Sequence, residues 1–409
     1  MDMKKEKITF NNIILITSFI LLLVDLFIRS NIYNDLIKVQ DIVAIIVVLY
    51  LIYIIKKLKQ HNFNNYIILV FSLYIIYLFS SNIIHYYLNS VNYLFVFYIL
   101  KEVEFFVFML LGIYILYNFK RLSINLFTIL ISLNIIYGFY QILKGSISYY
   151  GIRSIVTHAP AGSAAVFFLS TILLFYFYKI KDNFIYLLLA LSSNILLLAT
   201  VSRTYIIGII IFFGLYFAIN IYMNANLTMK KNYIINFTIV LLLIIIIFFF
   251  SVYFFQNAYT ETIKSRFSHI KRGLMIRFNK QIEYYNTLIK GSPISYLFGR
   301  GKSSPEYLIY GKSLAVDNQH TRAFFEMGLF GMILWYSVFI LIMIELIRLN
   351  NKSEIVFYAS LLFTYLIMGF AMELFQTTIS GLGFWLTTGL LLGNSYYRTY
   401  SEQVNTENT

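Results

Sequence analysis

The sequence predicts an all-α integral membrane protein with about 12 transmembrane helices and one long extracytoplasmic loop. Of its 409 residues, 60% are hydrophobic and only 12% are charged, and the mean hydropathy is +0.75. A soluble domain of this size could not bury so much apolar surface, so lipid must be the main solvent of the chain. The absence of cysteine excludes disulfides and thiolate sites.

Apolar stretches recur along the chain, and each approaches the ~20 residues needed to cross a hydrocarbon core. The first is long enough to span and lacks a small-residue cleavage site, so we expect it to be retained rather than removed as a signal peptide. The predicted spans are 9–28, 41–55, 65–84, 92–118, 124–143, 161–178, 184–200, 204–222, 233–255, 323–346, 355–372 and 380–397.

Basic residues alternate between the two sides of these spans. With the spans counted as above, 15 of the 32 Lys and Arg fall at connections on one side, whereas the short connections on the other side hold five. The positive-inside rule makes the first side the cytoplasm. We therefore expect a multi-pass protein of a bacterial inner (cytoplasmic) membrane, with both termini in the cytoplasm.

One outside connection, residues 256–322, is long and carries 11 Lys and Arg against four Asp and Glu, a net charge of +7. Apolar residues recur in it at helical spacing, which predicts an amphipathic helix over 263–290 on the outer membrane surface. Phe298-Gly299-Arg300-Gly301 then predicts a glycine turn. The expected organisation is nine spans in 1–255, the loop 256–322, three spans in 323–397 and a cytoplasmic tail 398–409.

Arginines on the outer side are the candidate anion-binding residues. Arg203 occupies the tight hairpin Ser202-Arg203-Thr204, although an arginine there also snorkels to lipid headgroups in many membrane proteins. Arg266 and Arg277 lie on nearly one face of the surface helix. The alternative interpretation is that this face is simply solvated or binds lipid headgroups. Arg300 stands between two glycines, where the backbone can approach a ligand closely, or is incidental to the turn. Arg153 lies in the loop before the sixth span.

Candidate proton acceptors gather where the tenth span begins. Asp317 and His320 lie at the outer edge, and Glu326 lies within the first turns, where an unpaired carboxylate would cost several kcal/mol. Such a group has a cationic partner or a task. Lys101, Glu102 and Glu104 also lie within a span, where Lys101 and Glu104 can pair at i, i+3, and we assign them no function.

Outward arginines beside an apolar surface suit a lipid-linked diphosphate. Guanidinium groups bind phosphate bidentately and stay charged, and they stabilise a diphosphate leaving group without a metal. An acceptor hydroxyl then needs a base, for which His320, Asp317 and Glu326 are the candidates. No paired-Asp or His-cluster motif lies outside the membrane, so we expect no metal. We also expect no cofactor of another kind and no nucleic acid as a partner.

The order of these features resembles the O-antigen polymerase and ligase superfamily, the Wzy-type polymerases and their relatives. The resemblance rests on Ser202-Arg203-Thr204, the loop with Phe298-Gly299-Arg300-Gly301, and Asp317-Asn318 followed by Glu326-Met327-Gly328-Leu329-Phe330-Gly331. It covers roughly the C-terminal half. Asp317 stands where the ligases of this superfamily carry a histidine, which favours a polymerase and leaves the base open.

The resemblance implies a GT-C-like helical fold and a metal-independent glycosyltransferase that polymerises surface polysaccharide, either O-antigen or capsule. Arg203 and Arg277 would then contact the diphosphate. The expected substrates are undecaprenyl-diphosphate-linked oligosaccharide repeat units in membrane lipid, and a chain-length regulator protein is a further expected partner. A ligase for finished glycan and an exporter of lipid-linked oligosaccharide or polysaccharide are the alternatives.

Overall fold

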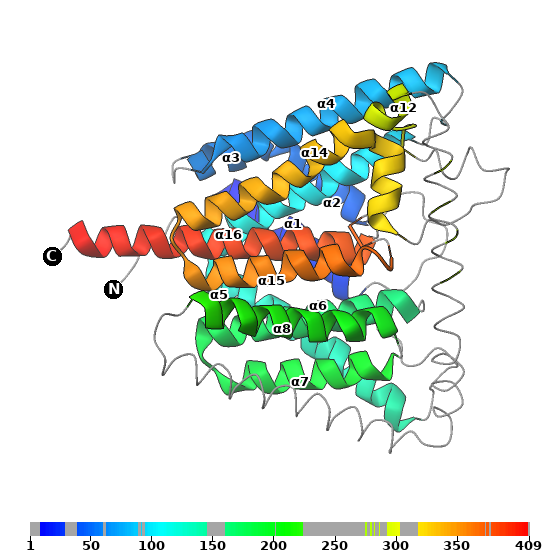
Figure 1. The fold of residues 1–409 in the computed structure, drawn as a ribbon. Coiled ribbons are helices and arrows are strands. Elements are labelled where there is room, and N and C mark those ends of the chain that lie inside the picture. The colour runs from blue at the N-terminus through cyan, green and yellow to red at the C-terminus, as the bar shows by residue number, and fades with distance from the viewer. Residues whose placement is uncertain are drawn as a thin grey trace.

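A computed structural model describes residues 9–28, 39–59, 63–88, 91, 95–144, 160–200, 202–223, 293–302, 318–372, 374–375 and 378–407, together with residues 275, 279, 282 and 286. Every described element is a helix, and no strand occurs in these ranges. The helices are α1 (Phe10–Ile28), α2 (Val39–Leu49), α3 (Leu51–Lys59), α4 (Asn65–Tyr87), α5 (Phe95–Leu143), α6 (Pro160–Lys181), α7 (Phe184–Ala199), α8 (Arg203–Met223), α12 (Pro293–Phe298), α14 (Gln319–Arg348), α15 (Lys352–Met368) and α16 (Thr378–Glu407) (Figure 1).

Four described helical segments are long and apolar enough to cross a membrane. They are Asn65–Tyr87, Gly162–Lys181, Arg203–Met223 and Gln319–Arg348. Helices α4 and α14 expose large apolar side chains such as Ile76 and Ile340, which suits lipid rather than water. The described part of the chain is thus an all-helical protein with the helices of a membrane protein.

Most predicted spans coincide with helices. The predicted span 41–55 is not one continuous helix, because it is divided at Tyr50 into α2 and α3. The stretches 92–118 and 124–143 form the two halves of α5, which has a non-helical backbone at Phe119. The predicted span 233–255 lies outside the described residues, as does most of the predicted surface helix 263–290, of which four exposed residues have helical backbone: Met275, Asn279, Ile282 and Asn286.

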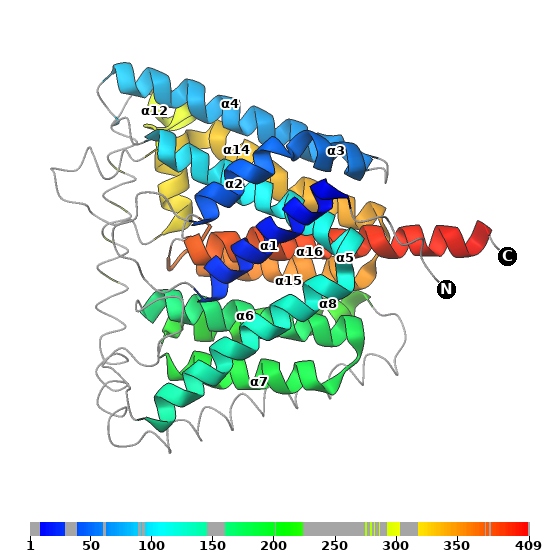
Figure 2. The same ribbon diagram turned by 180° about the vertical axis from the view of Figure 1, so that it is seen from behind.

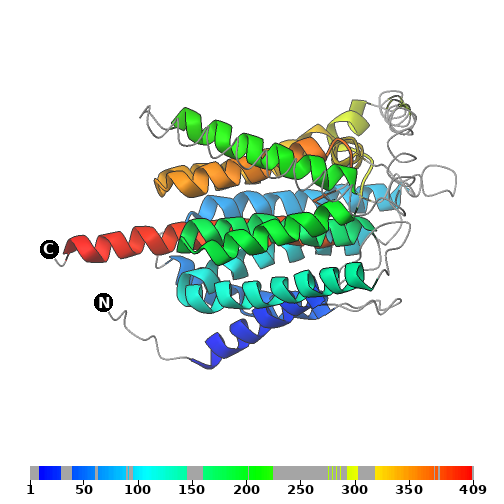
Figure 3. The ribbon, with the colours of Figure 1, turned by 90° about the horizontal axis from the view of Figure 1, so that it is seen from below.

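The helices lie side by side in a bundle, seen from opposite faces in Figures 1 and 2 and from below in Figure 3. Helix α6 lies in the interior, because 83% of its most apolar 18-residue stretch is buried. The corresponding share in α4, at the periphery, is 28%. In α16, Gly389 and Gly393 are four residues apart and therefore share one face. They let α16 pack against the backbone of Met109 and Ile113 in α5, as small residues do between membrane helices.

The end of the bundle that carries α12 lies opposite the end where α1 begins and α16 finishes (Figures 1 and 2). At this α12 end, α14 is broken at Gly328, whose φ is +63° and ψ is −171°. The part of α14 before Gly328 runs across the end of the bundle, and the part after it runs along the bundle (Figure 1). The bend places the start of α14 over the end of the bundle, where it meets α12 and the turn that follows.

Candidate functional site

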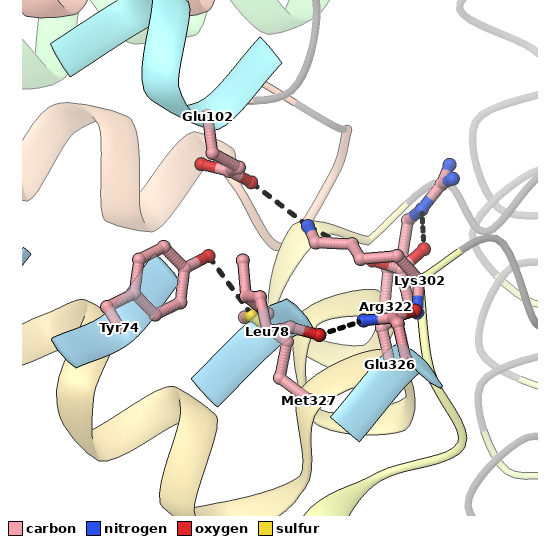
Figure 4. Close-up of polar contacts among 8 residues, drawn as sticks. Tyr74, Leu78, Glu102, Lys302, Arg322, Glu326 and Met327 are labelled. Atoms are coloured by element: carbon pink, nitrogen blue, oxygen red, sulfur yellow. Dashed lines mark hydrogen bonds and ion pairs between the residues drawn. The ribbon is translucent and has the colours of Figure 1, made fainter. Parts of the chain in front are cut away.

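Four buried charged side chains form a chain of ion pairs at the α12 end (Figure 4). The Lys302 Nζ lies 2.9 Å from Glu102 Oε1 and 3.3 Å from Glu326 Oε2. The other oxygen of Glu326 accepts a 2.9 Å hydrogen bond from Arg322 Nε. Positive and negative groups alternate from Arg322 to Glu102. We call these four residues the charge network.

Burial makes this arrangement strongly dependent on its partners. Each of the four residues is at most 8% exposed, and an unpaired charge at such a depth is far more costly than at a surface. Burial alone lowers the pKa of the Lys302 amine, but the carboxylates of Glu102 and Glu326 outweigh burial and hold the pKa above its usual value. Lys302 therefore stays charged, and its ion pairs with Glu102 in α5 and Glu326 in α14 join these two helices.

The backbone after α12 is fixed group by group. Arg300 N donates to the Phe325 carbonyl and Gly301 N to the Glu326 carbonyl, each at 2.9 Å. The next amide, Lys302 N, donates to Asn82 Oδ1 at 2.6 Å. We call residues 298–302 the Arg300 turn. Its consecutive amides are held by partners on α14 and α4, so the position of Arg300 is determined by the surrounding helices.

Broken helix geometry explains why α14 can hold this turn. The carbonyls of Phe325, Glu326 and Met327 lie in the last turn before the break at Gly328, where helix carbonyls lose their partners along the helix. Two of them accept the amides of the Arg300 turn, and the Met327 carbonyl accepts a hydrogen bond from the Tyr77 hydroxyl. The break thus creates the acceptors that dock the turn.

Two glycines allow the close approach. Gly299 has φ +75°, and a Cβ on it would lie 2.4 Å from the Glu326 carbonyl oxygen. A Cβ on Gly328 would lie 2.3 Å from Gly299 N. Both values are below any real contact, so side chains at these positions would separate the turn from α14. The sequence predicted the glycine turn, and Gly299 and Gly301 have the positive φ that such a turn uses.

A polar face of α4 completes the support for the turn. The Tyr77 hydroxyl, which donates its proton to the Met327 carbonyl, lies 3.1 Å from the Phe298 carbonyl oxygen. The Ser81 hydroxyl donates to the same Phe298 oxygen at 3.3 Å. One helical turn further on, the His85 ring donates to the backbone of Gly299 and lies close enough to Arg300 to be influenced by its charge. These three residues recur every fourth position, so they share one face of α4. That periodicity was visible in the sequence, although its target was not.

The predicted site residues occupy different places. Arg300 is half-buried in the turn, and Glu326 is in the charge network. Arg203, the first residue of α8, is also half-buried. Four further predicted residues lie outside the described part of the chain: Arg153, Arg266, Arg277 and Asp317.

His320 is held on another side of α14. Its Nδ1 is 2.5 Å from the Tyr336 hydroxyl, and its Nε2 is 2.7 Å from the Leu366 carbonyl oxygen in α15. A carbonyl can only accept, so Nε2 carries the proton and Nδ1 accepts from Tyr336. Nε2 therefore joins α14 to α15, and Nδ1 joins the parts of α14 on either side of the break at Gly328. Glu326 and Arg322 instead contact the turn and α5.

Sequence reasoning missed Lys302, Arg322 and the role of Glu102. The pair expected within α5 is present, since Lys101 Nζ lies 2.5 Å from Glu104 Oε2 and 2.6 Å from Asp41 Oδ1. Glu102 has no basic residue three or four positions away in either direction. This absence was the available signal that its partner comes from a distant segment.

No group of three or more His, Asp or Glu side chains is placed to hold a metal ion within the described residues. The polar groups that converge at the α12 end are suited instead to an anion, because a half-buried guanidinium is presented there on a fixed backbone. No protein-family model matches the sequence, and no curated protein matches it either.

Proposed function

We propose that the protein polymerises lipid-linked oligosaccharide repeat units on the outer face of a bacterial cytoplasmic membrane. The observation that carries this proposal is the placement of Arg300 on a turn whose amides are fixed by α14 and α4, at one end of an apolar helical bundle. A polyprenyl diphosphate has its charge at such an interface and its tail in lipid. Rigid presentation of a guanidinium is what transition-state stabilisation of a diphosphate requires.

In the proposed reaction, a hydroxyl oxygen of the incoming repeat unit attacks the anomeric carbon of the growing glycan. The bond from that carbon to the diphosphate oxygen breaks, and its electron pair leaves with undecaprenyl diphosphate. Arg203, Arg277 and Arg300 hold the diphosphates and stabilise the negative charge that develops on the leaving group. Arg266 supports the same anion from the surface helix, and Arg153 assists at the acceptor or leaving group.

The hydroxyl proton must pass to a base. Both ring nitrogens of His320 are already engaged, Nε2 with Leu366 in α15 and Nδ1 with Tyr336 in α14. Both carboxylate oxygens of Glu326 are bound by cations, Arg322 at 2.9 Å and Lys302 at 3.3 Å. Asp317, which directly precedes Asn318, the N-cap of α14, is therefore the favoured base of the three. A proton on Asp317 would then be released to water at the outer surface.

The proposed orientation follows from charge. The α12 end faces the outside, and the end where α1 begins and α16 finishes faces the cytoplasm, where the basic connections gather. The remaining predicted spans, including 233–255, complete the count of about 12. Under this orientation, the Arg300 turn lies at the outer membrane surface.

An exporter of lipid-linked glycan is the second candidate, because broken helices and buried charges within a membrane also occur along transport paths. The break at Gly328 and the adjacent charge network are features of this kind. In an exporter, Arg300 would bind the diphosphate during passage rather than during bond cleavage.

Liposomes that contain the purified protein and a defined lipid-linked repeat unit test the proposal. A polymerase converts single units into a ladder of longer lipid-linked chains and releases undecaprenyl diphosphate. An exporter changes the sidedness of the units and forms no new glycosidic bond. A ligase makes no ladder from single units, but transfers a long chain to a different added acceptor. Absence of a ladder with correctly folded protein would contradict the proposal.

A further inference from the structure

We infer that Glu102 and Lys302 are positioning residues that set the affinity of Arg300 for a lipid-linked diphosphate. This inference rests on the proposed function, because it assumes that Arg300 contacts that anion. The structural basis is a continuous set of contacts from α5 to the Arg300 turn. The Glu102 carboxylate binds the Lys302 amine at 2.9 Å, and Lys302 is two residues from Arg300.

Lys302 is anchored at both its backbone and its side chain. Its amide donates to Asn82 on α4 at 2.6 Å, and its ammonium binds Glu102 on α5 and Glu326 on α14. Three helices therefore converge on the residue that ends the turn. The other end of the turn is held through Phe298 by Ser81. Loss of the α5 anchor leaves one end of the turn less constrained.

The sign of the charge effect separates positioning from electrostatics. The four residues of the charge network sum to zero, with two cations and two carboxylates. Neutralising Glu102 makes this sum +1, which by charge alone attracts a diphosphate more strongly. If Glu102 acts by holding the turn, its loss weakens diphosphate binding instead. The two roles thus predict opposite changes in affinity.

Two substitutions at one position sharpen this comparison. Glu102→Gln and Glu102→Leu change the net charge equally, but only glutamine keeps an oxygen that can accept from the Lys302 amine. Glu104→Leu is the matched control, because Glu104 is another buried acid on α5 and is paired with Lys101 instead of Lys302. It reports the general effect of removing a buried carboxylate from this helix.

The first measurement is kinetic, with a synthetic undecaprenyl-diphosphate repeat unit as the varied substrate in liposomes. Misplacement of a binding group by about 1 Å is sufficient for a tenfold or larger effect, so we expect Glu102→Leu to raise KM by about tenfold or more and to change kcat less. Glu102→Gln should raise KM by no more than about threefold, because an acceptor for Lys302 remains. Equal effects of the two variants, or a lower KM in both, would overturn the positioning role.

The second measurement needs no catalysis. The protein contains no cysteine, so Arg300→Cys introduces a single thiol as a reporter of the turn. We expect a water-soluble maleimide to label this thiol several-fold faster when Glu102→Leu is added, and at an unchanged rate when Glu104→Leu is added. An unchanged rate with Glu102→Leu would overturn the inference and leave the proposed function intact. Faster labelling, combined with no polymer from the wild type, would support the positioning of the turn and reject the polymerase.

Discussion

Substitution of Lys302 by methionine removes a buried cation while keeping a side chain of similar length. Lys302 is 1% exposed, and its amine lies 2.9 Å from Glu102 and 3.3 Å from Glu326. After Lys302→Met, Glu326 keeps Arg322 at 2.9 Å, but Glu102 loses the cation that compensates it. Leaving one buried charge uncompensated costs about 3–5 kcal/mol, so we expect a loss of that size in the free energy of unfolding.

A second substitution tests the reason for that loss. In the double variant Lys302→Met, Glu102→Gln, no uncompensated charge remains, and replacing a whole buried pair is close to neutral in many proteins. We therefore expect the double variant to recover at least about 2 kcal/mol relative to Lys302→Met. Equilibrium unfolding by SDS in mixed micelles measures both values. A Lys302→Met protein as stable as the wild type, or a double variant no more stable than the single one, would refute the reasoning.

Three further predictions use other parts of the structure. Gly328→Ala should lower the free energy of unfolding by about 3 kcal/mol or more, because φ is positive there and the new Cβ would meet the Gly299 amide. The control is Gly214→Ala, whose Cβ would have nothing within 4 Å. In the same unfolding assay it should be neutral or slightly stabilising. The raised pKa of Lys302 means that its contribution is fully present below the usual value of 10.5 and is lost only above it. The stability difference between wild type and Lys302→Met should therefore stay constant from neutral pH to about pH 10 and shrink beyond it; a decline that begins below pH 9 would contradict this. Burial, together with the charges of Arg398 and Lys181, lowers the pKa of Lys120 to about 8. As pH rises from 7 to 9.5, the folded state therefore loses this proton before the unfolded state does, and the wild type should gain stability relative to Lys120→Met. A loss of stability relative to Lys120→Met over this range would contradict the lowered pKa.

Much of the helical framework follows from the sequence because lipid imposes a simple rule. Apolar runs of about 20 residues must form helices, since every backbone group needs an internal partner there. The runs 65–84 and 204–222 accordingly coincide closely with α4 and α8. The break of α14 at Gly328 was not predicted. An isolated glycine inside an apolar run is tolerated in a helix, and only its contact with the distant Gly299 requires a positive φ.

The candidate site was predictable only in part, because ion pairs between distant segments leave little local pattern. Glu326 was expected to need a cation, and the structure supplies both Arg322 and Lys302. Arg322 lies one turn earlier on the same helix and could have been inferred from i, i+4 spacing. Lys302 and Glu102 are 200 residues apart, and the sequence around neither residue indicates that the other is its partner.

The central claim is that arginines at the α12 end bind a diphosphate during polymerisation. The most direct test is to measure the chain length of surface glycan in cells that carry Arg203→Ala or Arg300→Ala. Each variant should be produced at the wild-type level, because both arginines are half-buried and lie outside the charge network. We predict single repeat units on lipid in place of the long-chain ladder. Normal ladders from well-produced Arg203→Ala and Arg300→Ala proteins would contradict the account.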